Sequence, residues 1–268
     1  MKNGRYQILL TNDDGIESPG LWAAANALSK IGFVTVAAPR DQASSTGRSL
    51  PITSDGRITA HQMRIGDQEW TVYAIGGSPA QTVLHGVLEI IGEKPDLVVS
   101  GINYGENLSD GITISGTVGA AMEGASMGIP SMAVSLQLLD DGFYTYSETV
   151  DFSTAAYFAQ HFALRMLERR MPADVNLIKV DIPTLATPQT PWRLTRQAVL
   201  RYFHPVVTRT GALEEPGPLG YKLSVRREEV PEDTDIYAVL FDKIVSVTPL
   251  SLDMTARVDF SKFDGLLR

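Results

Sequence analysis

Two adjacent carboxylates near the start of the chain are the first residues that could do chemistry. Asp13 and Asp14 lie in ILLTNDDG, directly after an apolar run that is typical of a buried strand. Adjacent carboxylates repel each other unless a proton or a cation neutralises them. A hard divalent cation such as Mg²⁺ or Mn²⁺ would remove this repulsion, because such ions prefer oxygen ligands. The alternative is an ordinary turn, since Asn12, the aspartates and Gly15 are all common turn residues.

Further oxygen-bearing side chains follow the other predicted strands. The loop after the second strand holds Ser44 and Ser45, and the loop after a strand at 96–101 holds Asn103 and Asn107. Ligands of open parallel sheets bind outside the carboxyl ends of the strands, so we expect these side chains to meet the carboxylate pair. The second loop also has a simpler explanation, because Gly and Asn tolerate positive φ and build irregular loops without a ligand.

A run of small residues, SGTVGAAMEGA, begins at Ser115. If a helix begins there, its free backbone N–H groups face the same sheet edge and form an anion site suited to phosphate. The alternative is simple capping, with Gly and Ala present for tight packing. The run lacks the GKS or GKT of a Walker loop and a full GxGxxG, which argues against a dinucleotide site. Cation and anion sites at one edge indicate metal-assisted chemistry on a phosphate.

The composition excludes several other classes. Lys plus Arg is 23 and Asp plus Glu is 31, giving a net charge of −8 without a basic run, so we expect no nucleic-acid partner. The absence of cysteine excludes disulfides and thiolate metal sites. The four histidines have no ligand spacing, and no G-x-S-x-G elbow is present. No segment approaches the ~20 apolar residues that span a bilayer, so we expect a soluble, cytoplasmic protein with no membrane partner.

The elements that position these residues alternate between strand and helix. Strands are expected at 6–11, 33–39, 96–101, 130–136 and 175–183, helices at 19–31, 79–91, 116–127 and 148–170, and a hairpin within 51–75. This order predicts a doubly wound, mostly parallel α/β core over residues 1–182. Eight of the 15 prolines fall between residues 183 and 249. Residues 183–268 are therefore expected to form a β-rich extension, with strands at TRQAVLRYF and YKLSVRR, that contacts another subunit.

Four segments resemble the stationary-phase survival protein E (SurE) family. They are ILLTNDDGIESPGL, APRDQASSTGRSL, VVSGINYGENLSDGITISGTVGAAMEGASMGIPSMAVSL and VSVTPLSLDMT. The resemblance covers residues 6–137 and returns at 234–255, and its combination of NDDG, SGIN-x-G-x-N and SGTV is highly specific. Two departures stand out. Gln81 replaces an acidic residue of the family's GTPADCV, and the family's GYVSVTPL has become DKIVSVTPL, with Asp242 and Lys243 at its start.

The resemblance implies a Rossmann-like fold whose C-terminal extension exchanges between the subunits of a homodimer or homotetramer. It implies a divalent-metal-dependent phosphatase that hydrolyses nucleoside 5′- and 3′-monophosphates, and in some members short polyphosphate. One Mg²⁺ or Mn²⁺ per subunit would be held by Asp13, Asp14, Ser44 (or its neighbour Ser45) and Asn103, with either aspartate assisting as a base. Contacts to phosphate or substrate would come from Asn12, Asn107, Ser115, Gly116 and Thr117. Gln81 is expected to alter local packing or specificity, and the change at Asp242 puts substrate contacts from that arm in doubt.

Two other classes share part of this pattern. A phospho-receiver module also carries an acidic pair after its first strand, but it needs an acceptor aspartate where this chain has Ser100 and Asn103. A non-catalytic nucleotide-binding protein with the same ligands stays open as an alternative, and an assay of phosphate release separates it from the enzyme.

Overall fold

The structure is a computed structural model that describes residues 4–65, 68–138 and 150–268, and a nine-stranded sheet lies at its centre. The strands are β1 (Tyr6–Thr11), β2 (Gly32–Pro39), β3 (Ile58–Ile65), β4 (Gln68–Ile75), β5 (Leu97–Tyr104), β6 (Ser131–Leu136), β7 (Leu177–Ile182), β8 (Trp192–Leu194) and β11 (Val245–Leu250). Six of them run parallel in the order β4-β2-β1-β5-β6-β7. β3 is antiparallel to β4, β11 is antiparallel to β7, and β8 is parallel to β11. The prediction of a mostly parallel α/β sheet is confirmed.

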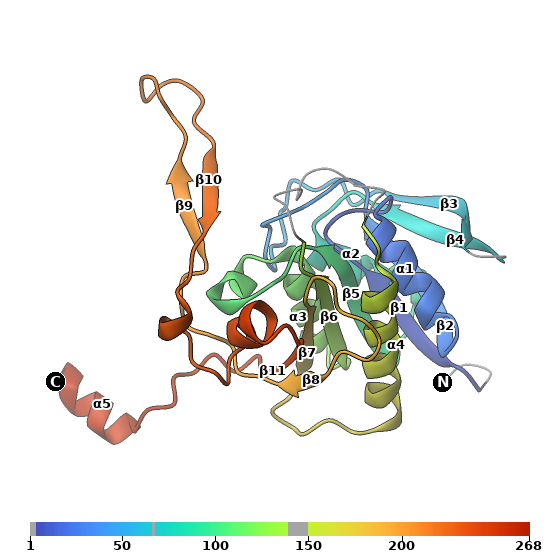
Figure 1. Cartoon of the computed structure of the whole chain (residues 1–268). Helices are drawn as coiled ribbons and strands as arrows, with labels where there is room; N and C mark the ends of the chain where they lie inside the picture. Colours follow the sequence, from blue (N-terminus) through green and yellow to red (C-terminus); the bar gives the residue numbers. More distant parts are fainter. Residues whose placement is uncertain (1–3, 66–67, 139–149) are drawn as a thin grey trace.

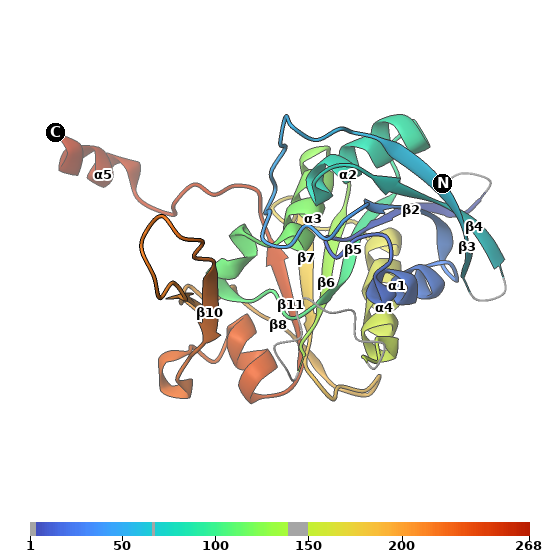
Figure 2. The ribbon, with the colours of Figure 1, turned by 90° about the horizontal axis from the view of Figure 1, so that it is seen from above.

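Helices cover both faces of this sheet. α1 (Pro19–Leu28) and α4 (Ser153–Glu168) lie together on one face, whereas α2 (Pro79–His85) and α3 (Gly116–Ser126) lie on the other (Figures 1 and 2). Successive side chains of a strand point to opposite faces. Ile8 and Leu10 accordingly join the core beneath α1 and α4, and Leu9 joins the core beneath α2 and α3. This burial on both faces explains why the parallel strands are continuous apolar runs.

The order of the strands reverses direction at β1. The chain passes from β1 to β2 on one side and later returns to place β5 on the other side, where Thr11 pairs with Ser100. Such a switch point leaves a crevice at the carboxyl ends of the two strands. Asp13 and Asn103 follow Thr11 and Ser100 by two and three residues, so both enter this crevice.

The residues after β7 divide between the sheet and projecting parts. β8 and β11 extend the main sheet, while β9 (Phe203–Val207) and β10 (Leu219–Leu223) form a separate antiparallel hairpin that projects from the body (Figure 1). The last helix, α5 (Phe260–Leu267), also lies apart from the body and buries none of its side chains. A β-rich extension is thus confirmed as part of the fold, whereas the boundary at residue 182 and the contact with another subunit stay predictions.

The strand predicted at TRQAVLRYF is wrong over residues 195–202, where the structure has only an isolated bridge from Arg196 to Thr234. The reason is that side chains take the place of a neighbouring strand. The backbone N–H of Ala198 donates to a carboxylate oxygen of Asp235 at 2.9 Å, and that of Leu200 donates to the Ser109 hydroxyl at 3.1 Å.

Several predicted boundaries also move. The strand predicted at YKLSVRR ends at Leu223, and a 3₁₀ turn, η3 (Arg227–Glu229), follows. The helix predicted at 79–91 changes from α2 into a π-helical turn, η1 (Gly86–Ile91). The helix predicted from residue 148 begins at Ser153, and residues 148 and 149 lie outside the described part of the chain. Within the described residues, no helix combines the length and the apolar character needed to span a membrane.

The chain also forms two other short helical turns. η2 (Ser109–Thr113) connects the loop after β5 to α3, and η4 (Tyr237–Phe241) precedes β11. Gly111 of η2 lines the cavity described below, and Tyr237 and Val239 of η4 pack in one apolar cluster with Leu108.

Candidate active site

The turn after β1 places its two carboxylates at the crevice. The Asn12 side chain closes this turn, because its Oδ1 accepts from the N–H of Gly15 at 3.2 Å and its Nδ2 donates to the Gly15 carbonyl at 2.9 Å. The ordinary turn weighed from the sequence as the alternative is therefore present. The presence of this turn does not exclude a functional site, because Asp13 and Asp14 both line a cavity.

Asp13 and Asp14 are almost completely buried, at 5% and 2% exposure. Burial raises the pKa of Asp13 from its ordinary value of 3.8 to about 6, although hydrogen bonds from Thr117 and Gly116 oppose the rise. Burial, followed by repulsion from Asp13, raises the pKa of Asp14 well above its ordinary value. The backbone N–H of Tyr104 donates to Asp14 Oδ2 at 3.2 Å. Two carboxylates held side by side out of water are the arrangement that a bound cation would relieve.

The beginning of α3 holds Asp13 in place. The Thr117 hydroxyl donates to Asp13 Oδ1, and the Ser115 hydroxyl caps the helix by accepting from the N–H of Val118 at 3.1 Å. A Cβ on Gly116 would stand 2.7 Å from Asp13 Cβ, so only glycine permits this approach. The tight packing weighed from the sequence is thus present at this helix start. Gly116 and Thr117 lie behind Asp13 and do not line the cavity, and their contact with phosphate stays a prediction.

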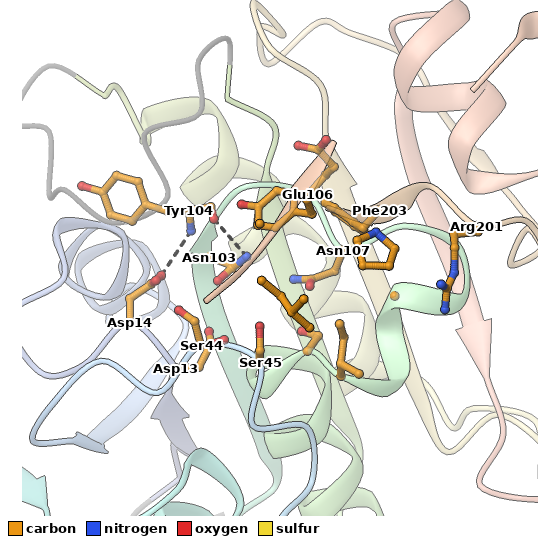
Figure 3. A pocket seen from close by; sticks show the side chains of 17 residues that line it. Asp13, Asp14, Ser44, Ser45, Asn103, Tyr104, Glu106, Asn107, Arg201 and Phe203 are labelled. Atoms are coloured by element: carbon orange, nitrogen blue, oxygen red, sulfur yellow. Dashed lines mark hydrogen bonds between the residues drawn. The ribbon is translucent and has the colours of Figure 1, made fainter. Parts of the chain in front are cut away.

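The loop after β2 brings two serines to the same cavity as the carboxylates (Figure 3). The backbone N–H of Ala43 donates to the Asp13 carbonyl at 2.8 Å, which ties the loop to the first turn. Ser44 and Ser45 are exposed and both line the cavity, and the Gln42 amide donates to the Ser44 hydroxyl at 3.1 Å. Both serines therefore stay candidates for the hydroxyl ligand predicted at Ser44.

The loop after β5 supplies the amides. Asn103 Nδ2 donates to the carbonyls of Tyr104 and Gly105, at 3.2 and 2.7 Å, which directs its Oδ1 away from those carbonyls. Asn107 Nδ2 donates to the Ser135 hydroxyl at 2.8 Å. Both asparagines line the cavity, as expected from the sequence.

The cavity has a volume of about 460 Å³ and brings together six of the nine predicted site residues (Figure 3). These six are Asp13, Asp14, Ser44, Asn103, Asn107 and Ser115. The carboxylates lie on one side of the cavity and Arg201 on the other. Sequence reasoning missed the whole wall contributed by the extension. Its members are Arg201, Phe203, Pro205, Leu219, Gly220 and Tyr221.

A buried ionic cluster connects this wall to the core and was also missed. Lys179 on β7 is fully buried and pairs with Asp181 and with Asp235, the latter at 3.2 Å. Asp181 accepts from the N–H of Asn107 at 2.8 Å, and Asp235 accepts from that of Ser109 at 3.0 Å. Lys179 and Asp181 are charged residues inside the apolar strand VNLIKVDIP, and this pattern could have indicated the cluster from the sequence. No local pattern indicated Asp235.

The donor set at the carboxylates fits a hard divalent cation. Two carboxylates, a hydroxyl and an amide oxygen are all oxygen donors, which suit Mg²⁺ or Mn²⁺. Among the described residues, no cluster of three or more His, Cys, Asp or Glu side chains could hold a metal. A cation at this position would therefore depend on the hydroxyl and amide oxygens in addition to Asp13 and Asp14.

Comparison with known proteins identifies the family to which this chain belongs. Residues 8–204 match the family model described as Survival protein SurE. This chain belongs to the SurE family. A 5′-nucleotidase SurE from Methanosarcina mazei is 40% identical over 273 residues, and the alignment covers 97% of each chain. One from Thermococcus gammatolerans is 42% identical over 267 residues, covering 97% of this chain and 96% of the relative. The crystal structure of the SurE protein from Aquifex aeolicus matches with a TM-score of 0.77 and 34% identity, covering 98% of this chain and 100% of that one.

The two departures from the SurE pattern lie outside the cavity. Gln81 caps α2, because its Oε1 accepts from the N–H of Ser78 at 3.0 Å while the Ser78 hydroxyl accepts from the Gln81 N–H at 3.2 Å. Gln81 Nε2 also donates to the Pro51 carbonyl at 2.9 Å. Asp242 pairs with Arg193 at 3.0 Å. Gln81 thus has a packing role here, and neither departure contacts the predicted ligands.

Proposed function

We propose that this SurE chain is a divalent-metal-dependent phosphatase that releases phosphate from nucleoside monophosphates. The observation that carries the proposal is the pair of buried carboxylates, Asp13 and Asp14, facing a cavity together with Ser44, Asn103 and Asn107. The relatives named 5′-nucleotidase support the choice of nucleotides as the substrate class. Activity on 3′-monophosphates and on short polyphosphate belongs to the same proposal.

In this proposal the chain positions four oxygen ligands and binds phosphate beside them. Asp13, Asp14, Ser44 and Asn103 would hold one Mg²⁺ or Mn²⁺, which lowers the pKa of coordinated water and offsets charge on the phosphoryl oxygens. Thr117 and Tyr104 fix the orientation of the two carboxylates through their hydrogen bonds.

The phosphate would lie between the carboxylate side and the groups of the next loop. Asn107 and Ser115 line that part of the cavity and carry donors that can contact phosphoryl oxygens. The backbone of Asn107 is held by Asp181, so its position does not depend on the substrate. Donors fixed before the substrate arrives stabilise developing charge without reorganisation. Asp13 or Asp14 would take the proton of the water that attacks phosphorus, while the P–O bond to the nucleoside breaks and the leaving oxygen takes up a proton from solvent.

The experiment is a measurement of phosphate release from a panel of nucleoside 5′- and 3′-monophosphates and tripolyphosphate. Each substrate is assayed with Mn²⁺, with Mg²⁺ and with EDTA. We expect release with a divalent cation and a loss of at least about 10²-fold in EDTA, as expected when a Lewis acid is removed. Equal release in EDTA would contradict the metal requirement. Nucleotide binding without any release would favour the non-catalytic alternative.

A homodimer or homotetramer and a cytoplasmic location complete the proposal. Exposed apolar side chains of α5 support assembly, because Phe260, Phe263 and Leu266 are 67%, 47% and 81% exposed in the single chain. Apolar groups gathered on one short helix are typical of a surface that a partner covers. Light scattering of the full chain would give the number of subunits, and a monomer at micromolar concentration would contradict this part of the proposal.

A further inference from the structure

The cavity has an apolar half that the proposed chemistry does not use. By this half we mean the lining contributed by Ile114 and by the hairpin residues Phe203, Pro205, Leu219 and Tyr221, in addition to the carboxylates and amides. A volume of about 460 Å³ lies within the range of pockets that bind drug-sized ligands, so a phosphate group alone would leave much of it empty. The group attached to the phosphate is therefore expected to occupy the apolar half.

Two aromatic rings of the hairpin give this half a defined shape. The ring centroids of Phe203 on β9 and Tyr221 on β10 lie 5.7 Å apart, with their planes at 84°. The Phe203 ring is held in place by Tyr202, at 4.7 Å between centroids, and by close contact with Gly111, where an added Cβ would stand 3.1 Å from the ring. Two rings at a right angle form a corner in which a flat group can stack on one ring and meet the edge of the other.

The charges around the cavity favour an uncharged group in this corner. Arg201 is the cationic side chain among the described residues that line the cavity, and Asp13, Asp14 and Glu106 are the acidic ones. A second anionic group would find one cation, Arg201, among the described residues that line the cavity, whereas a nucleobase is neutral and flat. Stacking on aromatic side chains also tolerates any base, because every base has a π-face.

We propose that Phe203 and Tyr221 form a base-binding subsite, so that the preferred substrates are phosphate monoesters whose alcohol carries a planar aromatic ring. This inference rests on the proposed function for the phosphate end of the cavity. The two rings carry none of the oxygen ligands predicted for the cation, so their role would be to bind the leaving group and to determine specificity. The extension thereby supplies substrate recognition to a reaction carried out by the core.

The test compares adenosine 5′-monophosphate with ribose 5-phosphate, which keeps the sugar and the phosphate but lacks the base. Steady-state constants are measured for the wild type, for Phe203→Leu, and for Tyr221→Leu and Tyr221→Phe. We expect each leucine variant to raise KM for adenosine monophosphate about tenfold, since stacking contributes about 1–3 kcal/mol per base and 1.4 kcal/mol is a factor of ten. KM for ribose 5-phosphate should change less than about twofold, and Tyr221→Phe should raise KM for adenosine monophosphate less than Tyr221→Leu does, because it keeps the ring.

Val207→Ala is the matched control, because Val207 is 73% exposed on the same strand as Phe203 and does not line the cavity. Equal losses on both substrates would overturn the subsite, since the rings would then only shape the cavity. Unchanged constants in both leucine variants would overturn it too.

Binding of adenosine, measured by calorimetry, keeps the two proposals separate. If no variant releases phosphate, the phosphatase proposal fails, while adenosine binding that is lost in the leucine variants still supports the subsite.

Discussion

The two walls of the cavity are built in opposite ways. On the core wall, Asp13 and Asp14 are 5% and 2% exposed and are held by hydrogen bonds from α3 and β5. On the extension wall, Tyr221 and Leu219 are 39% and 72% exposed and lie on a projecting hairpin. Reacting groups need fixed geometry, which a buried sheet edge supplies. Recognition can be assigned to exposed side chains, because changes there leave the fold intact.

The largest effect is expected when a carboxylate of the core wall is removed. Asp14→Ala should lower phosphate release by at least about 10³-fold, because it removes both a cation ligand and a candidate base. The variant should stay folded, since it also removes a buried charge. Phosphate release and circular dichroism check the two statements.

Asp41→Ala is the control for that variant. Asp41 lies at the same sheet edge with its side chain 78% exposed, and it does not line the cavity. Full activity in Asp41→Ala together with full activity in Asp14→Ala would show that the core wall does not carry the chemistry.

The second prediction concerns Lys179, whose pairs with Asp181 and Asp235 connect the two walls. Lys179→Met leaves Asp181 and Asp235 buried without their cation, and breaking a buried pair costs about 3–5 kcal/mol. The free energy of unfolding measured in urea should fall by that amount. Arg196→Ala is the matched control, because its pair with Asp233 is 82% and 62% exposed and should contribute less than about 1 kcal/mol. Equal losses would mean that the cluster adds no more than a surface pair.

A smaller effect should appear in the pH dependence of stability without a divalent cation. Burial raises the pKa of Asp13 to about 6 in the folded state, so its ionisation destabilises the fold as pH rises from about 4 through 6. In EDTA, Asp13→Asn should therefore gain stability over the wild type as pH rises through this window, by about 1.4 kcal/mol per pH unit. Urea unfolding of both proteins at several pH values measures this difference.

The same variant also reports on the cation. Mg²⁺ at pH 7.5 should raise the unfolding temperature of the wild type and have a smaller effect on Asp13→Asn, because a ligand that binds only the folded state stabilises it. In EDTA, a difference in the free energy of unfolding between the two proteins that is constant from pH 4 to 7.5 would contradict the burial of an ionisable group at this position.

The core wall could be predicted from the sequence, whereas the extension wall could not. The residues of the core wall follow strands in short motifs, so the apolar pattern alone is enough to bring Asp13, Asn103 and Ser115 to one sheet edge. The extension wall depends on contacts between distant segments. Arg201 follows a stretch whose backbone bonds to Asp235 and Ser109, and the strand predicted there from the sequence does not form.

Gln81 offers the smallest test, because it belongs to neither wall. Its side chain caps α2 and accepts from the Ser54 hydroxyl at 2.7 Å, and it does not line the cavity. Gln81→Ala should lower the free energy of unfolding by about 1 kcal/mol, the usual contribution of a capping interaction. KM for nucleotides should stay within about twofold of the wild type, because neither the ligands nor the hairpin rings move. A larger change in KM would mean that the loop held by Gln81, which continues from Ser44 and Ser45, transmits its position to the cavity, and substrate choice would then depend on a third region.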